Sequence, residues 1–513
     1  MLRSYTKPTV ALARASVSSR SIYTHPSFKL SDPSLLVSTG WVNGRPLEAQ
    51  SGDTYNLTDP ATNQTWHSMA DLGVHETEQA IQAAHDAFPA FSAIPARTRG
   101  RMIMEMDRLF LQAKDDLAQI AVMECGKTLQ EALGELGAAS SVSWLMAGEA
   151  ERNIGETIKG VEADNMRYFT IREPVGPAAL LSPWNFPIFL PWRKLVSALA
   201  AGCTVVMKPS PETPVTTAAM ALIAQRAGVP DGVVNVVTSS VKGTPKVGKV
   251  LCEDKRIKKM HFTGSTPVGK LLAHQCAGTL KKMTLELGGN GAFIVFEDAD
   301  LDQAATLLVA NKFRNAGQVC VSANRVYVHR SIHDQFAKIV EQKVRALRIG
   351  HGLDKGTTTG SLATQRGVER CVRLVEDAKR KGATVVTGGN RVGEGWHFEP
   401  TLLVGAGRDA IVHREEMFAP ILSMYAFDSE DEVVRLANDT DMGLTNYVQT
   451  QNVSRAWRMF EALKSGQVAI NTGNATSSEM PFGGIKASGM GKEGGYGYGI
   501  QDFCNVRTAA LML

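Results

Sequence analysis

The pattern of hydrophobic and polar residues separates a helical stretch near the N-terminus from two later stretches in which strands and helices alternate. Between 76 and 150, hydrophobic residues recur three and four positions apart, as in Ile81, Ala84 and Phe88. Residues at this spacing share one face of a helix, so this stretch predicts a series of amphipathic helices. The preceding stretch, 35–70, favours short strands and turns.

The first alternating stretch covers 176–280. Short hydrophobic runs predict strands at 177–181, 203–208, 233–237 and 259–262. Helical spacing follows each of them, at 190–201, 214–227, 243–253 and 266–277. Strands that alternate with helices predict a parallel, doubly wound sheet, which binds ligands at the carboxyl ends of its strands.

A second alternating stretch begins at residue 291. Strands are predicted at 292–296, 326–328, 383–386 and 468–470, and helices at 301–313, 332–347, 365–381, 430–438 and 453–464. The predicted fold is therefore α/β, with two doubly wound α/β domains.

Two shorter stretches differ from both domains. Residues 153–175 alternate, above all in Met166-Arg-Tyr-Phe-Thr-Ile-Arg, and predict an extended hairpin. The chain ends in a Gly-rich stretch after 483 and a short apolar tail that can pair with another subunit. We place the domains at 29–152 with 176–285, at 286–482, and, for a small β extension, at 153–175 with 483–513.

Composition and charge exclude several classes of protein. The net charge of +4 is too small to indicate nucleic-acid binding, and Lys and Arg are interspersed with Asp and Glu. No hydrophobic run approaches the ~18 residues of a membrane-spanning helix, so we expect no membrane insertion. The seven cysteines lie far apart, without Cys-x-x-Cys or zinc spacing, which predicts a reducing compartment and no metal site.

The first 28 residues have the composition of an organelle transit peptide. Their charges are Arg3, Lys7, Arg14 and Arg20, and no acidic residue precedes Asp32. Ser, Thr and Ala fill most of the gaps, and the long apolar stretch of a secretory signal is missing. We interpret residues 1–28 as a mitochondrial presequence that is absent from the mature fold, which predicts a location in the mitochondrial matrix. The alternative is a basic tail that carries no address.

Cys320 is the leading candidate for chemistry. It lies between the predicted helix at 301–313 and a strand-like run at 325–329, among small and polar residues. A thiol in such a place can be open to a ligand, and nearby helix ends or cations can lower its pKa toward the reactive thiolate. The alternative is that it is a small buried hydrophobic residue.

Six segments together resemble the aldehyde dehydrogenase superfamily, in family order and over nearly the whole chain. They are Ser182-Pro-Trp-Asn-Phe-Pro, Phe262-Thr-Gly-Ser-Thr, Leu285-Glu-Leu-Gly-Gly, Gly317-Gln-Val-Cys, Glu415-Glu-Met-Phe-Ala-Pro and Pro481-Phe-Gly-Gly-Ile-Lys. The resemblance implies a Rossmann-like NAD(P)-binding domain, a catalytic domain and a hairpin that serves oligomerisation. It also implies a homo-oligomer, either a tetramer or a dimer.

The resemblance also implies the roles of three residues. Cys320 is the expected nucleophile, which forms a thiohemiacetal and then a thioester with an aldehyde. Asn185 is the expected oxyanion donor, together with the backbone N–H of Cys320. Glu286 is the expected general base, because an acid among apolar neighbours tends to have a raised pKa. Taken singly, Asn185 also suits a turn before proline, and Glu286 an ion pair at the end of a sheet.

The cofactor implied is NAD or NADP. Gly264, Ser265 and Gly269 stand between a strand and a helix, where backbone N–H groups can hold phosphate. This turn lacks the Gly-x-Gly-x-x-Gly spacing, and with Lys270 it imitates a P-loop, so a nucleotide hydrolase is a rival class. The resemblance adds further cofactor-binding residues, namely Ser182, Trp184, Lys208, Leu287, Glu416 and Phe418. Pro211 replaces the glutamate of many NAD-preferring members, which leaves the choice between NAD and NADP open.

The substrate implied is succinate semialdehyde. Arg193 and Arg314 resemble the paired arginines with which succinate-semialdehyde dehydrogenases bind the distal carboxylate, and Thr476 and Ser477 stand where that subfamily has a helping serine. Other carboxylated, aliphatic or aromatic aldehydes are the alternatives within the family. A Cys–Glu thioester hydrolase without redox chemistry is the alternative outside it. Ser322 replaces a second cysteine of some members, so we expect no disulfide control at this site.

Overall fold

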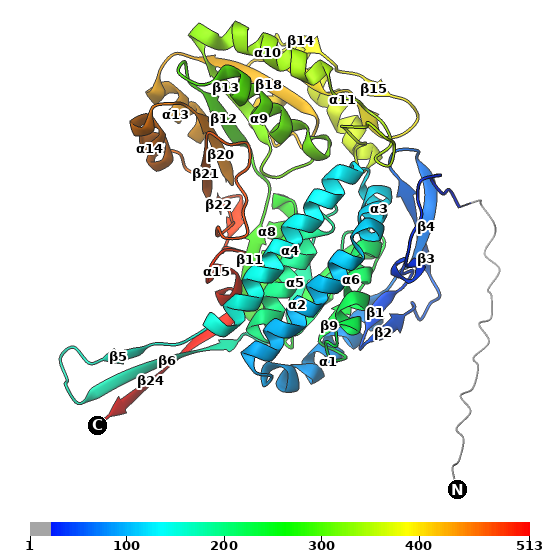
Figure 1. Cartoon of the computed structure of the whole chain (residues 1–513), viewed down its shortest axis with the longest axis vertical. Coiled ribbons are helices and arrows are strands. Elements are labelled where there is room, and N and C mark those ends of the chain that lie inside the picture. The colour runs from blue at the N-terminus through cyan, green and yellow to red at the C-terminus, as the bar shows by residue number, and fades with distance from the viewer. Residues whose placement is uncertain (1–21) are drawn as a thin grey trace.

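A computed structural model describes residues 22–513. Its body contains two sheets, each covered by helices on both faces, and an arm that projects from one side (Figure 1). This architecture confirms the predicted fold class. None of the helices in 22–513 combines the length and apolar character that crossing a membrane requires. Within the same residues, no group of three or more His, Cys, Asp or Glu side chains is placed to hold a metal ion.

The first sheet has eight strands, and the five at its centre are parallel. In spatial order they are β2 (Arg45–Leu47), β1 (Gly40–Val42), β9 (Val234–Val236), β8 (Val205–Lys208), β7 (Ala178–Leu181), β10 (Lys259–Thr263), β11 (Lys282–Glu286) and β23 (Gly489–Met490). The central strands β7, β8, β9 and β10 are buried along their whole length because helices cover both of their faces. Residues 489–490, which we assigned to the β extension, instead pair with β11.

Helices on the two faces of this sheet form separate hydrophobic cores. One face packs against α2 (Ala96–Gln112), α3 (Lys114–Cys125), α4 (Leu129–Arg152), α5 (Phe189–Ala201) and α6 (Pro214–Arg226). The other packs against α1 (Val74–Ser92), α7 (Thr244–Glu253) and α8 (Thr266–Cys276). Most boundaries lie within one or two residues of those predicted.

The second sheet has seven strands, all parallel except β14 at one edge. Their order is β14 (Thr384–Thr387), β17 (Thr401–Val404), β18 (Ile421–Phe427), β13 (Ala323–His329), β12 (Gly291–Val295), β20 (Thr445–Gln449) and β21 (Gln467–Ile470). One face packs against α9 (Leu301–Phe313) and α10 (His333–Arg345), and the other against α11 (Gln365–Arg380), α12 (Ile411–Arg414), α13 (Glu430–Asn438) and α14 (Val453–Ala462). Strands β17, β18 and β20 were not predicted.

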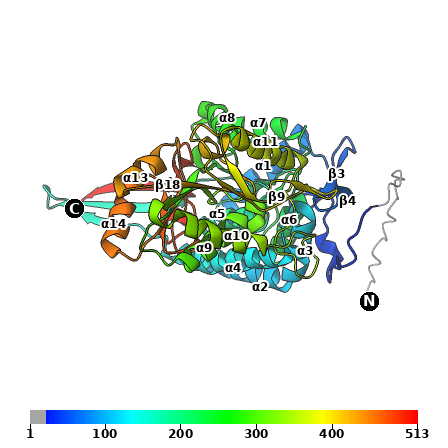
Figure 2. The same ribbon diagram turned by 90° about the horizontal axis from the view of Figure 1, so that it is seen from above.

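The arm consists of β5 (Thr157–Lys159), β6 (Met166–Pro174) and β24 (Cys504–Met512). The predicted hairpin is confirmed as β5 and β6. The C-terminal tail, β24, pairs antiparallel with β6 of the same chain along the whole length of both strands. Figure 2 shows the arm on the opposite side of the molecule from the hairpin of β3 (Thr54–Asp59) and β4 (Gln64–Ala70).

Most of the predicted presequence lies outside the described residues. Its last residues, however, pack on the body. The backbone N–H of Tyr23 donates to Thr65 O at 2.9 Å, and the His25 ring stacks on that of His351 with centroids 4.0 Å apart. A leader that extends to residue 28 would therefore remove contacts that this fold makes.

Candidate active site

Two cavities meet where the two sheets face each other. The smaller has a volume of about 340 Å³ and the larger about 570 Å³. Four residues line both of them, namely Thr263, Glu286, Leu287 and Cys320. Thr263 and Glu286 are the last residues of β10 and β11, so the cavities lie at the carboxyl ends of parallel strands, as expected for a doubly wound sheet.

Cys320 lies between a short turn, η3 (Arg314–Gly317), and β13. Its side chain is half-buried and faces both cavities. The expected lowering of its pKa is not found. Burial raises the pKa of the thiol to about 12, and the carboxylates of Glu416 and Glu286 add to this effect, against the weaker pull of Arg193 and Arg314. In this state the thiol is protonated and needs a base before it can act as a nucleophile.

Asn185 follows β7 and is buried beside the segment that leads to Cys320. Its side-chain Nδ2 donates to the carbonyl of Gln318 at 3.0 Å, and it lines the larger cavity together with Cys320. The amide and the thiol therefore line the same cavity, and Nδ2 carries a second N–H besides the one that binds Gln318, as an oxyanion donor requires.

Glu286 lies at the end of β11 with both carboxylate oxygens buried. Within 22–513 neither oxygen has a hydrogen-bond partner. Burial raises the pKa of Glu286 well above its usual value, and the charge of Glu493 adds to this, while Arg193 and Lys194 oppose it. The pKa of Glu493 is shifted in the opposite direction, because ion pairs with Arg193 and Lys194 hold it well below the usual range. Two carboxyl groups with opposite pKa shifts are typical of a site in which one acts as a base.

The smaller cavity combines aromatic walls with two cations. The guanidinium of Arg193 lies over the rings of Phe189 and Phe482, at 4.7 and 4.9 Å, and that of Arg314 lies over Phe186 at 5.5 Å. Both arginines line the cavity, and the Nε of each is buried without a partner in the described part of the chain. Arg193 is already ion-paired with Glu493, which the sequence did not predict.

The two predicted hydroxyl residues lie in different places. Thr476 lines the smaller cavity, where its Oγ1 donates to Asn474 Oδ1 at 2.8 Å. Ser477 is exposed, donates to the carboxylate of Glu479 and is absent from the lining of either cavity.

The larger cavity gathers most of the predicted cofactor-binding residues. Those that line it are Trp184, Gly264, Ser265, Leu287, Glu416 and Phe418. Lys208 ends β8 and Ser182 directly follows the neighbouring β7, but neither residue lines the larger cavity. Gly269 also lies outside, and a Cβ there would come within 2.4 Å of Leu287 Cδ2, so its role is close packing of α8 on the sheet.

The structure of this cavity fits a nicotinamide nucleotide. Ser265 precedes α8, and no side chain caps the backbone N–H groups of that helix start, which suits a phosphate. Glu416 is half-buried and accepts from the Gly289 N–H at 3.1 Å, and desolvation of its carboxylate raises its pKa to about 7. The Trp184 and Phe418 rings stand edge to face, 5.5 Å apart.

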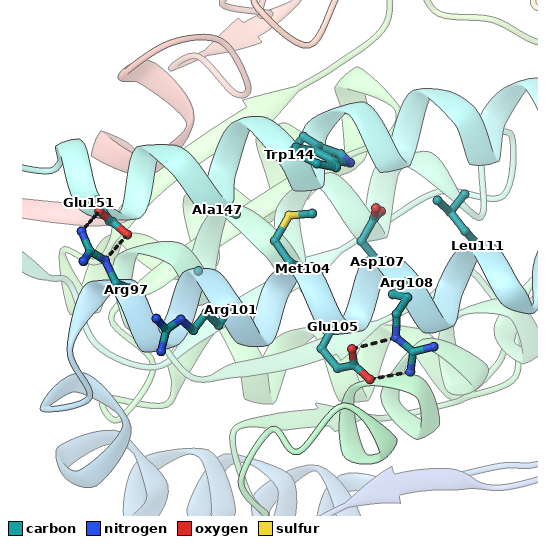
Figure 3. A pocket seen from close by; sticks show the side chains of 11 residues that line it. Arg97, Arg101, Met104, Glu105, Asp107, Arg108, Leu111, Trp144, Ala147 and Glu151 are labelled. Carbon is teal, nitrogen blue, oxygen red and sulfur yellow. Dashed lines mark hydrogen bonds and ion pairs between the residues drawn. The ribbon is translucent and has the colours of Figure 1, made fainter.

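A further hollow of about 700 Å³ lies on the outside of the body, between α2 and α4 (Figure 3). An ion pair joins Arg97 of α2 to Glu151 of α4, and another joins Arg108 to Glu105 along α2 (Figure 3). The hollow has no thiol and shares no residue with the two inner cavities, so we do not regard it as the reaction site.

Comparison of the sequence with known proteins identifies a family and several similar enzymes. A profile described as "Aldehyde dehydrogenase family" matches residues 47–509. An NADP+-dependent succinate-semialdehyde dehydrogenase of Escherichia coli is 44% identical, over 94% of this chain and 100% of its own. A glutarate-semialdehyde dehydrogenase of Pseudomonas putida is 43% identical, over 94% and 99%. A mitochondrial succinate-semialdehyde dehydrogenase of Mus musculus is 44% identical, over 92% and 90%.

Solved structures agree as well. An NADP-dependent enzyme from E. coli superposes with a TM-score of 0.92 at 43% identity, over 94% of this chain and 100% of that one. A betaine aldehyde dehydrogenase of Staphylococcus aureus, solved with NAD+, superposes with a TM-score of 0.89 at 29% identity, over 95% and 97%.

Proposed function

This chain belongs to the aldehyde dehydrogenase family, whose members use NAD or NADP, and we propose that it oxidises succinate semialdehyde to succinate through a thioester on Cys320. One observation carries the proposal. An aromatic cavity with two arginine side chains opens onto the one thiol that also faces the larger cavity. In the overall reaction, the aldehyde, NAD(P)+ and water give the acid, NAD(P)H and a proton.

The first half of the reaction forms a bond between Cys320 and the aldehyde carbon. Glu286 takes the thiol proton, which its raised pKa favours. The sulfur then attacks the carbonyl carbon, and the Asn185 amide with the Cys320 backbone N–H holds the oxygen that becomes negative. When bound in the larger cavity, the nicotinamide supplies a hydride acceptor.

The second half of the reaction releases the acid. Glu286 first releases the thiol proton to solvent, which is the proton of the overall reaction. It then takes a proton from water, which attacks the thioester carbon, and it returns a proton to the Cys320 sulfur as the C–S bond breaks. Glu493 remains ionised beside Arg193 and Lys194 and leaves Glu286 as the one unpaired carboxylate at this position.

The substrate's distal carboxylate is proposed to contact Arg193 and Arg314. Such a charge-assisted hydrogen bond contributes about 1.5–3 kcal/mol. Replacing either arginine with alanine should therefore lower kcat/KM for succinate semialdehyde by roughly ten- to a hundredfold. The loss for butanal, which lacks the carboxylate, should be much smaller. Thr476→Ala should show the same bias more weakly, because a neutral hydroxyl binds a carboxylate less strongly.

The measurement is kcat/KM for both aldehydes, followed at 340 nm with NAD and with NADP. Arg455→Ala serves as a matched control, since Arg455 pairs with Glu297 and Asp298 outside both cavities. Ser477→Ala is the control for Thr476→Ala. If kcat/KM falls equally for both aldehydes, the arginines have a structural role and do not select the substrate. A wild type that prefers glutarate semialdehyde, one methylene longer, or butanal would refute the proposed substrate.

The arm is proposed to join subunits into a dimer or tetramer. It presents exposed hydrophobic side chains on β5, β6 and β24, including Ile158, Ile171, Val506 and Met512, which are 45%, 49%, 62% and 70% exposed. The strand register puts Ile158, Val506 and Met512 on one face of the arm and Ile171 on the other. Exposed hydrophobic side chains on a projecting element suit a protein interface.

The location is proposed to be the mitochondrial matrix. Residues 1–28 fused to a fluorescent protein should direct it to mitochondria, because the segment is basic and free of acid. The same fusion with glutamine at positions 3, 7, 14 and 20 should stay in the cytosol. A diffuse signal from the unchanged fusion would contradict the proposal. Since Tyr23 packs on the body, we place the cleavage before it.

A further inference from the structure

The junction between α3 and α4 contains a buried ion pair, one member of which, Glu135, lines the smaller cavity. Lys127 stands in this junction, and its Nζ is ion-paired with Glu135 of α4, with each side chain 1% exposed. Burying two charges is unfavourable unless additional hydrogen bonds satisfy them. The partners of this pair therefore indicate what it holds in place.

Both members of the pair bind the segment that carries Asn185. Lys127 Nζ donates to the backbone carbonyl of Asn185 at 3.0 Å. Glu135 Oε1 accepts from the N–H groups of Ile188 and Phe189, at 2.6 and 2.7 Å. These groups lie at the start of α5, which has no side-chain cap of its own. The ion pair thus supplies the missing cap and fixes residues 185–189 at both ends.

Helix α4 also holds the segment that leads to Cys320. Asn315 and Ala316 have φ values of 51° and 52°, which are unfavourable for residues with a Cβ. Glu131 of α4 accepts from the Asn315 N–H at 2.6 Å. The Asn315 side chain in turn donates to the Asn185 carbonyl at 2.9 Å, the same oxygen that Lys127 binds. The carbonyl of Asn185 is therefore the point at which the two segments are joined.

We infer that Lys127, together with Glu135, is a positioning residue for the reaction, which fixes the Asn185 backbone so that its amide stays beside Cys320. The inference rests on the proposed function. Lys127 lines neither inner cavity, so it acts through Asn185 and not on substrate or cofactor, whereas Glu135 also lines the smaller cavity.

The test is a double-mutant cycle with Asn185. Lys127→Met leaves Glu135 buried and unpaired. The charge-neutral variant Lys127→Met/Glu135→Gln is therefore made as well. In this variant the glutamine side-chain oxygen can still accept from the N–H groups at the start of α5. Each should lower kcat by about 10²-fold, since a misplacement of about 1 Å has effects of that size. The cofactor Kd should not change.

In an Asn185→Ala background, the same changes should lower kcat by less than about threefold, because residues that act through one another are not additive. Lys281→Met is the matched control, as Lys281 is a buried lysine that binds backbone carbonyls of Leu251 and Asp254 away from the site. Its kcat should equal that of the wild type.

Two outcomes would overturn the inference: an unchanged kcat in the charge-neutral variant, or an equal loss with and without the Asn185 amide. An inactive wild type would instead overturn the proposed function, so the two failures can be told apart.

Discussion

Cys320→Ala is expected to abolish formation of NAD(P)H while cofactor binding persists. Cys320 is the single thiol among the residues that line the two inner cavities, so no neighbouring sulfur can replace it. Loss of a covalent nucleophile lowers kcat on the order of 10⁴-fold or more. The cofactor contacts come from other residues, including Trp184 and Glu416.

The measurement combines turnover at 340 nm with cofactor binding followed by protein fluorescence. Cys276→Ala is the control, because Cys276, the last residue of α8, is buried in the core and outside both cavities. Clear turnover by the purified Cys320→Ala protein would refute the covalent mechanism. A loss of cofactor binding together with turnover would indicate a damaged fold.

The second large effect is expected from Glu286→Gln. This change should slow thioester hydrolysis by about 10²-fold or more, the scale of a general base. Glu286 acts as a base in its ionised form, and its pKa is raised well above the usual value. The wild-type hydrolysis rate should therefore fall as the pH is lowered through this raised pKa, and the Glu286→Gln rate should lose that dependence.

Because Glu286 also takes the thiol proton in the first half-reaction, the two half-reactions are separated by rapid mixing at high pH, where the Cys320 thiol ionises without a base. A burst of NAD(P)H followed by slow turnover would place the defect at hydrolysis. Glu297→Gln is the control, since Glu297 pairs with Arg455 away from the cavities. A wild-type rate and pH profile in Glu286→Gln would remove this residue from the mechanism.

The sequence predicted four of the five central strands of the first sheet and the helices that follow them, but not β11, whose Lys282 and Thr284 interrupt the hydrophobic pattern. The second sheet was harder to predict. Strand β20 carries Thr445, Asn446 and Gln449, which look like loop residues, but all three are buried. Asn446 Oδ1 accepts from the Ala292 N–H at 2.9 Å, on the neighbouring strand. A polar residue that finds its partner in a distant strand gives no local signal.

The same limit applies to the site. Local sequence and family resemblance identified Cys320, Asn185 and Glu286 as candidates, and the structure brings them together. The sequence could not show that Glu493 pairs with Arg193, because 300 residues separate them. Nor could it show that burial would outweigh the two nearby cations at Cys320 and raise the pKa of the thiol. Both effects depend on contacts that only the folded chain makes.

Pairing of β24 with β6 has a consequence for synthesis on the ribosome. Arg507 of β24 and Glu173 of β6, which form an ion pair in the arm, are 334 residues apart in sequence. At about 5–20 residues per second, β6 leaves the ribosome roughly 15–70 s before its partner is made. During this interval the hairpin has an unpaired edge and exposed Tyr168 and Ile171. Nascent chains of this protein therefore need chaperones to cover the unpaired edge of β6 until the last residues emerge. A chain truncated before β24 would keep that edge exposed permanently.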